Sequence, residues 1–524
     1  MTKQITIYDT TLRDGSQSQG ISFTVNDKIK IAEKLDELGV HYIEAGWPGS
    51  NPKDRELFSV LKKHKFKNSI LTAFGSTRRA NLKPTQDDNL KELIKSETPT
   101  ITIFGKSWDF HVTDIIKTTL EENLAMISDS VNFLKNKKRE VFYDAEHFFD
   151  GYKRNPEYAL QTILKAQEAG ADCIILCDTN GGTLPTEVRR IVREIRDNFK
   201  IPLGIHTHND MQLAVANSLA AVDEGCTQIQ GTFNGLGERC GNADLSVLIG
   251  ILQTKYKIKS INDHNVKKLM DVSHFISEIS NVKLPDNHAF VGHSAFAHKG
   301  GVHIDAILKN PLAYEHIEPE IVGNHRRLIT SELAGKMPIV LKAKKFNVDL
   351  DKKSPEAKRL LKILQQKEHE GYQFEDADAS FELFLKREMK KYKPFFKLEG
   401  FKVQSEKRID GKVFAEATVR VNVNGKEEFS ASDGDGPVDA LDRALRRALT
   451  KFYPSVNQMH LSDYKVRVLN SKEAAAARVR VLIESQDETD SWTTVGVHEN
   501  IIEASWEALI DSIEYKLLKD KEKN

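Results

Sequence analysis

The sequence predicts an α/β chain whose first half forms a closed (β/α)8 barrel, the TIM-barrel fold. Short β-branched and aromatic runs alternate with amphipathic stretches, which indicates parallel strands connected by helices. Eight strand–helix units in about 250 residues fit a barrel. An open doubly wound sheet is the alternative, but it would need a glycine-rich phosphate loop after the first run, and none is there. The eight runs are 5–9, 40–46, 69–75, 100–105, 140–146, 173–179, 203–210 and 228–235.

The stretches between the runs have the spacing of helices. In residues 26–39 the apolar side chains lie on one helical stripe, and the stretch ends in Gly39, a residue that tolerates a left-handed helix end. Residues 155–170 and 213–225 end in glycine in the same way. The stripe of the first stretch consists of Ile29, Ile31, Ala32, Leu35 and Leu38.

Three parts are expected along the 524 residues: a barrel over 1–280, a mixed helical linker region over 281–395 that completes the active site, and a small α+β regulatory domain over 396–524. Residues 341–395 are highly charged and read as helices that are not apolar enough to form a core. The last part contains a repeat, because residues 417–449 resemble 477–509. Each copy reads as a ββα unit.

The start of each repeat helix is acidic, at Asp439 and Glu503. Strand–turn–helix units present backbone N–H groups that suit a small anionic effector. Packing within a dimer is the alternative use of the repeat.

The composition excludes several classes of function. Lysine plus arginine equals aspartate plus glutamate at 76 each, so no overall cationic excess indicates nucleic-acid binding. No apolar run approaches the ~20 residues that span a bilayer, and the N-terminus has no signal pattern. The four cysteines form no CxxC pair. We expect a soluble protein of the reducing cytoplasm.

Polar residues follow the ends of the predicted strands, and this is where barrel enzymes have their catalytic residues. HTHND (206–210) is the strongest local signal, because His206 and His208 are two apart and face the same side of a strand. Asp14 follows the first strand, which only the eighth strand separates from the seventh. Two histidines and a carboxylate suit Zn²⁺, Mn²⁺ or Fe²⁺. Hydrogen-bonded structural histidines are the alternative, and Asn242 is a candidate additional ligand.

Neighbouring residues suggest a task for that ion. Arg13 suits polarising a carbonyl or stabilising an enolate oxygen, or it forms an ion pair with Glu44. Glu146 either holds a substrate or is a structural carboxylate at the barrel mouth. His303, with Asp305 two residues further on, is a candidate general base. The alternative is a structural role, which is more common for a histidine.

DTTLRDGSQ (9–17), HTHND and GERCGN (237–242) together resemble the metal-dependent Claisen-condensing barrel enzymes. These are the 2-isopropylmalate, homocitrate and citramalate synthases, and HMG-CoA lyase has a similar barrel. GVHIDAI (301–307) and GDGPVDAL (434–441) extend the resemblance into the linker and the regulatory domain. EAGWPGSNPKD (44–54) and TVGVHENIIEASWEAL (494–509) favour one branch of citramalate synthases.

The resemblance implies an acyltransferase that condenses acetyl-CoA with pyruvate and hydrolyses the thioester to (R)-citramalate and CoA. This would be the first step of a threonine-independent isoleucine pathway, with isoleucine as the expected feedback effector. The cofactor is a divalent ion, Mn²⁺, Zn²⁺ or Mg²⁺, on Asp14, His206 and His208. Arg13 would polarise the keto group with Glu44 behind it, and Thr179 would bind the carboxylate.

The remaining expected roles also follow from the resemblance. His303 would remove a proton from acetyl-CoA, with Glu238 nearby or bridged by water. Tyr314 resembles a tyrosine that reaches the site of a neighbouring subunit, so a homodimer is expected. Glu146 is expected among the catalytic residues and to line the pocket. The other expected substrate contacts are Gln17, His111 and Asp144.

Two points in the pocket stay open. Asp144 departs from the better-known synthases, and an aspartate near an apolar side-chain pocket has no evident role. Trp47, Phe74 and Phe104 follow strands and would shorten the pocket to fit pyruvate, or they are ordinary core aromatics.

Three other functions are weighed against this one. A 2-isopropylmalate synthase would use the larger 2-ketoisovalerate. A lyase of the HMG-CoA type would lack the long C-terminal region. A catalytically dead amino-acid sensor would not need the set of Arg13, Asp14, Glu146, His206 and His208.

Overall fold

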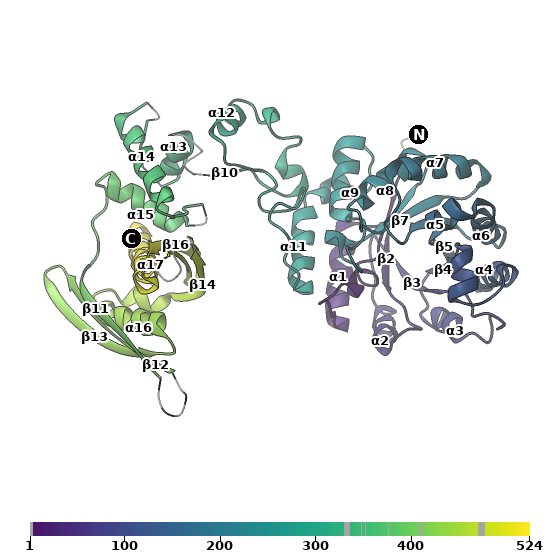
Figure 1. The fold of residues 1–524 in the computed structure, drawn as a ribbon, viewed down its shortest axis with the longest axis horizontal. Coiled ribbons are helices and arrows are strands. Elements are labelled where there is room, and N and C mark those ends of the chain that lie inside the picture. Colours follow the sequence, from purple (N-terminus) through teal and green to yellow (C-terminus); the bar gives the residue numbers. More distant parts are fainter. Residues whose placement is uncertain are drawn as a thin grey trace. The chain divides into compact units, whose positions relative to one another are not determined.

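The computed structural model describes residues 4–329, 336–346, 348–351, 353–375, 377–407, 409, 411, 413–469 and 477–523 (Figure 1). They form two compact units, each described here by itself. The first comprises Met1–Phe296 and Ile317–Arg326, and the second comprises Ala297–His316 and Arg327–Asn524. The expected boundaries at residues 280 and 395 stay predictions.

The first unit is a closed barrel of eight parallel strands, which confirms the predicted fold. Each strand pairs with the next, and β1 pairs with β8 to close the barrel, with Ile7 opposite Ile229. The strands are β1 (Thr6–Asp9), β2 (Tyr42–Gly46), β3 (Ile70–Ser76), β4 (Thr100–Lys106), β5 (Glu140–Glu146), β6 (Cys173–Asp178), β7 (Leu203–Thr207) and β8 (Gln228–Gly231).

Helices surround the strands of this unit (Figure 1). They are α1 (Val25–Leu38), α2 (Pro52–Leu61), α3 (Asp88–Lys95), α4 (Leu120–Asn136), α5 (Phe148–Arg154), α6 (Pro156–Glu168), α7 (Pro185–Ile195), α8 (Ala214–Asp223), α9 (Leu245–Ile251), α10 (Asp263–Val266) and α11 (Leu269–Ser280).

Local sequence explains where α1 begins and ends. The Thr24 hydroxyl accepts the Asp27 N–H and the Asp27 carboxylate accepts the Thr24 N–H, a reciprocal cap of the first turn. The helix stops at Gly39, whose φ of 90° is open to glycine at little cost. The predicted stripe is confirmed, because Ile31, Leu35 and Leu38 are fully buried.

The second unit begins with short elements and helices: β9 (Ala297–His298), α12 (Gly301–Lys309), β10 (Arg327–Leu328), α13 (Lys336–Lys345), α14 (Pro355–His369) and α15 (Asp378–Glu388). The prediction that this region is not apolar enough for a core is wrong. Leu360 and Leu364 of α14 and Phe381 of α15 are fully buried together, with Val495 and Val497. Spacing at i and i+4 puts the few apolar residues of α14 on one face, and neighbouring helices and strands combine such faces.

The C-terminal repeat is confirmed, and each copy has one strand more than the expected ββα unit. The first copy is β11 (Lys397–Lys407), β12 (Val413–Val423), β13 (Lys426–Gly434) and α16 (Pro437–Thr450). The second is β14 (His460–Val468), β15 (Val479–Gln486), β16 (Ser491–His498) and α17 (Ile501–Lys523). Both sheets are antiparallel.

All four cysteines are free thiols, and only Cys240 is exposed. None of the helices among the described residues combines the length and the apolar character that crossing a membrane requires.

Replacing Phe381 by alanine tests the helical core. The cavity should lower the free energy of unfolding of the second unit by about 3–5 kcal/mol. Urea unfolding followed by circular dichroism measures the change. Lys362→Ala, at an exposed position of α14, should leave the curve within about 0.5 kcal/mol of the wild type. An unchanged unfolding curve for Phe381→Ala would contradict the burial of Phe381 in this core.

Candidate active site at the barrel mouth

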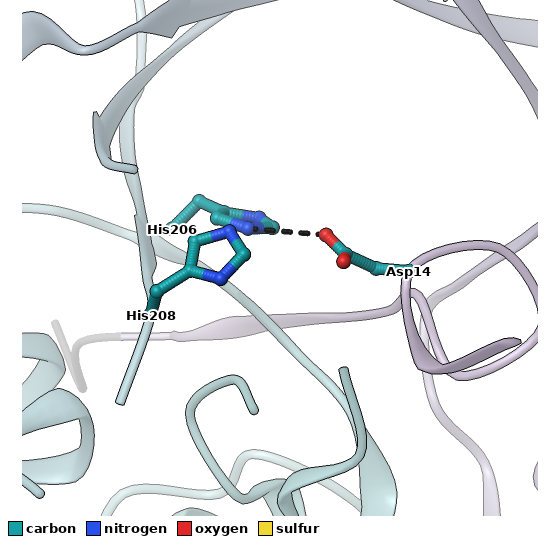
Figure 2. A group of neighbouring side chains, drawn as sticks. All are labelled: Asp14, His206 and His208. Atoms are coloured by element: carbon teal, nitrogen blue, oxygen red, sulfur yellow. Dashed lines mark ion pairs between the residues drawn. The ribbon is translucent and has the colours of Figure 1, made fainter. Parts of the chain in front are cut away.

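Asp14, His206 and His208 converge at the carboxyl ends of β1 and β7. A tight turn follows β1, in which the Asp14 N–H donates to the Thr10 carbonyl at 2.9 Å. One potential ligand atom from each side chain lies within 4.8 Å of the other two. Figure 2 shows both imidazoles turned toward the carboxylate, and His206 Nε2 is 3.4 Å from Asp14 Oδ2. All three side chains are buried.

Further polar contacts orient this cluster. His206 Nδ1 is 2.9 Å from Gln230 Oε1, which directs the other ring nitrogen toward Asp14. Gln230 Nε2 in turn donates to Asp144 at 3.1 Å. The backbone of Asn242 forms a bridge with His208, and Asn242 Oδ1 is buried with no hydrogen-bond partner among the described residues. A buried donor set with a spare oxygen beside it fits a cation.

The charge states of Asp14 and His208 are those of metal ligands. Burial raises the pKa of Asp14, but Arg13 and the two histidines together hold it well below its usual range. Burial and the neighbouring His206 lower the pKa of His208 to about 3. Burial opposes a charge on His206, yet the hydrogen bond and charge of Asp14 raise its pKa overall. At neutral pH the carboxylate is ionised and His208 is neutral.

Arg13 is held in place by the strand beside it. Its Nε donates to Glu44 Oε1 at 2.6 Å, which confirms the ion pair considered from the sequence. Its Nη1 donates to Asp14 at 3.1 Å, and its guanidinium carbon lies 3.8 Å from the centre of the Phe74 ring. Glu44 also accepts hydrogen bonds from the Thr10 and Tyr8 hydroxyls. A guanidinium fixed this way is preorganised to stabilise negative charge.

These groups surround a cavity of about 200 Å³, enough for a small keto acid. Of the residues expected at the site, nine line it: Arg13, Asp14, Gln17, Asp144, Glu146, Thr179, His206, His208 and Glu238. Trp47, Phe74, Phe104, Cys177 and Arg239 complete the lining.

Three expected residues lie outside that lining. Glu44 stands behind Arg13, and Asn242 stands beside His208. His111 follows β4 and packs on His147 with ring centres 4.2 Å apart and on Trp108 at 5.2 Å.

His303 and Tyr314 belong to the second unit. Their rings stack with centres 3.9 Å apart. Their place relative to the barrel site stays a prediction.

The structure also shows contacts that the sequence did not reveal. Lys106 pairs with Glu146, and Arg239 joins two loops by bonding Asp210 at 2.7 Å and the Thr179 carbonyl at 2.7 Å. Burial raises the pKa of Asp144 to about 7, and the charge of Glu44 adds to the effect. The contact of Asp144 with Gln230 gives this odd aspartate a structural role. The one sequence feature that could have indicated this contact is a polar residue, Gln230, within a strand of buried residues.

Comparisons with known proteins identify all three regions of the chain. The HMGL-like family matches residues 4–276, so the barrel and its site are of that class. A homocitrate synthase post-HMGL domain-like region matches 290–369, and the LeuA allosteric (dimerisation) domain matches 375–517.

The chain belongs to the (R)-citramalate synthase family. It is 55% identical to the (R)-citramalate synthase of Geobacter sulfurreducens over 519 residues, covering 99% of this chain and 98% of the relative. It is also 55% identical to that of Aquifex aeolicus over 524 residues, covering 100% and 99%. A 2-isopropylmalate synthase of Methanocaldococcus jannaschii is 32% identical, covering 99% and 96%. The resemblance found in the sequence is confirmed, and the protein is an enzyme.

Gln230→Ala should weaken Mn²⁺ binding about 10- to 100-fold, because His206 loses the partner that orients it. Isothermal titration of the purified protein with Mn²⁺ measures this. Gln404→Ala, at an exposed position of β11, is the matched control and should bind like the wild type. Equal affinity of the Gln230 variant and the wild type would contradict the orienting role.

Proposed function

We propose that this enzyme condenses acetyl-CoA with pyruvate and hydrolyses the thioester, releasing (R)-citramalate and CoA. The observation that carries the proposal is 55% identity over the whole chain to (R)-citramalate synthases. The cavity supports it, because one side is rich in groups that bind a keto acid and the other is aromatic and apolar.

Asp14, His206 and His208 are the proposed ligands of a divalent cation, Mn²⁺, Zn²⁺ or Mg²⁺, with Asn242 as an additional oxygen ligand. Such an ion, when bound, supplies Lewis acidity toward a carbonyl. Arg13 donates hydrogen bonds to the keto oxygen of pyruvate and stabilises the negative charge that grows there. Glu44 keeps Arg13 oriented, and Thr179 and Gln17 bind the carboxylate end.

The proton chemistry is assigned to the second half of the chain and to the loop after β8. His303 removes a proton from the methyl group of acetyl-CoA, and the resulting carbanion attacks the keto carbon. Glu238, at the cavity, assists directly or through water. Tyr314 acts in the site of the partner subunit of a homodimer. The stacking of His303 on Tyr314 at 3.9 Å supports a linked role for the two.

The aromatic side of the cavity limits the size of the keto acid. Trp47, Phe74 and Phe104 pack against one another there. An extra methylene in an apolar pocket changes discrimination by about 10- to 200-fold. A keto acid with a methyl side chain is therefore favoured over one with an isopropyl group.

A panel of keto acids with acetyl-CoA tests the reaction. Release of free CoA thiol should be fastest with pyruvate and much slower with 2-ketoisovalerate, and EDTA should abolish it until a divalent ion is restored. Asp14→Ala should lose at least about 100-fold in kcat/KM, because the ligand set loses its one charge. Preference for 2-ketoisovalerate would instead identify a 2-isopropylmalate synthase. CoA-thioester cleavage without condensation would support a lyase.

We further propose that isoleucine is a feedback inhibitor bound by the C-terminal repeat, and that the enzyme is a cytoplasmic homodimer. The match of residues 375–517 to an allosteric (dimerisation) domain supports both a regulatory and a dimerising role. The turn before α16 is tightly built, since a Cβ at Gly434 would lie 2.4 Å from the Ala440 nitrogen.

Isoleucine should therefore inhibit the full-length enzyme, and leucine should inhibit less. Gly434→Ala should weaken this inhibition several-fold without changing the uninhibited rate, because the turn must shift to admit the methyl group. Gly400→Ala is the control, since a Cβ there meets nothing within 4 Å. Inhibition assays and isothermal titration measure both variants. Absence of heat and of inhibition with either amino acid would reject the effector proposal.

A further inference from the structure

Trp47, Phe74 and Phe104 line the cavity next to one another, and we call this group the aromatic wall. The indole of Trp47 meets Phe74 edge-on, with ring centres 5.8 Å apart, and Phe104 edge-on at 5.6 Å. Phe74 and Phe104 are stacked on each other at 5.5 Å. Because Phe74 also lies 3.8 Å from the Arg13 guanidinium, the wall directly adjoins the group proposed to bind the keto oxygen.

The backbone of Trp47 is fixed by a buried ion pair. The Trp47 N–H donates to Asp54 Oδ2 at 2.9 Å, and Lys28 Nζ donates to Asp54 Oδ1 at 2.7 Å. Gly46 leaves room for this contact, since a Cβ there would lie 2.6 Å from the Asp54 carboxyl carbon. These contacts hold the main chain of Trp47 but do not reach its ring.

The ring of Trp47 is fixed from a different element. Its Nε1 donates to Asn89 Oδ1 at 2.6 Å, and Asn89 Nδ2 donates to the Ser76 carbonyl at 2.8 Å. Asn89 lies in the first turn of α3 and does not line the cavity. Ser76 ends β3, two residues after Phe74, so the amide ties the indole to the strand that carries its aromatic neighbour.

We infer that Asn89 is a positioning residue that sets the size of keto acid the enzyme accepts, acting through the ring of Trp47. This inference rests on the proposed function. A hydrogen bond at the far end of the indole restricts rotation of the ring. The Trp47 side chain therefore cannot rotate away from the cavity to make room for an extra methylene. Without the bond, the ring keeps its edge-on contacts with Phe74 and Phe104 but loses the restraint at its far end.

The test compares kcat/KM for 2-ketobutyrate, which has one methylene more than pyruvate, with kcat/KM for pyruvate. Asn89→Leu, of similar volume, should raise this ratio about 10-fold, the lower end of what one methylene is worth. Asn89→Asp keeps the acceptor for Trp47 and removes the donor to Ser76, so its ratio should stay within twofold of the wild type. An equal rise in both variants would overturn the inference, because loss of the hydrogen bond to the indole would then not be the cause of the rise.

A double-mutant cycle shows whether Asn89 acts through Trp47. Trp47→Phe has no ring N–H, so adding Asn89→Leu to it should leave the ratio unchanged. The same 10-fold rise in that background would overturn the inference. Asn89→Ala replaces Asn89→Leu if the leucine variant does not fold. Lys95→Ala, a substitution of an ion-paired residue at an exposed position of α3, is the control for disturbance of that helix.

The outcomes separate this inference from the proposed function. A wild-type enzyme that prefers 2-ketoisovalerate refutes the proposed function whatever the variants do. A wild-type enzyme that prefers pyruvate, with an unchanged ratio in Asn89→Leu, overturns only the role of Asn89.

Discussion

Closure of the barrel by pairing of β1 with β8 is the constraint on which the site depends. It places the turn after β1 across one strand from the end of β7, so Asp14 meets His206 and His208 although about 190 residues separate them in sequence. The separate pairing of β1 with β2 brings Glu44 to Arg13. An open sheet with the same strand order would leave β1 and β8 at opposite edges and separate Asp14 from both histidines.

The charged side chains buried at the barrel mouth each need an oppositely charged or hydrogen-bonding partner. Arg13 is shared between Glu44 and Asp14, and Glu44 also accepts hydrogen bonds from the hydroxyls of Tyr8 and Thr10. A buried charge without such partners would cost several kcal/mol, so the network is a condition for the barrel to fold as well as for its chemistry. The aromatic wall has a parallel support in the buried pair of Lys28 and Asp54.

The sequence predicted the barrel and the metal-binding cluster because both follow from local patterns. Strand–helix alternation gives the fold, and two histidines at i and i+2 on a strand end must face the same side. It did not predict Gln230 or Asn89 as supports, because each acts through one contact with a residue distant in sequence, and a single glutamine or asparagine has no distinguishing pattern. The linker core was missed for another reason: its apolar residues stand among many charged ones in each helix, and the assembly of several elements buries them.

The chain of contacts from Asp144 to His206 has a consequence for proton placement on the imidazole. The amide nitrogen of Gln230 faces Asp144, so its oxygen faces His206 Nδ1. An amide oxygen can only accept, which obliges a neutral His206 to carry its hydrogen on Nδ1 and to leave a lone pair on Nε2. Asp144, while ionised, thereby selects one tautomer of His206 through Gln230, which explains why an aspartate can stand in a pocket otherwise shaped for an apolar side chain.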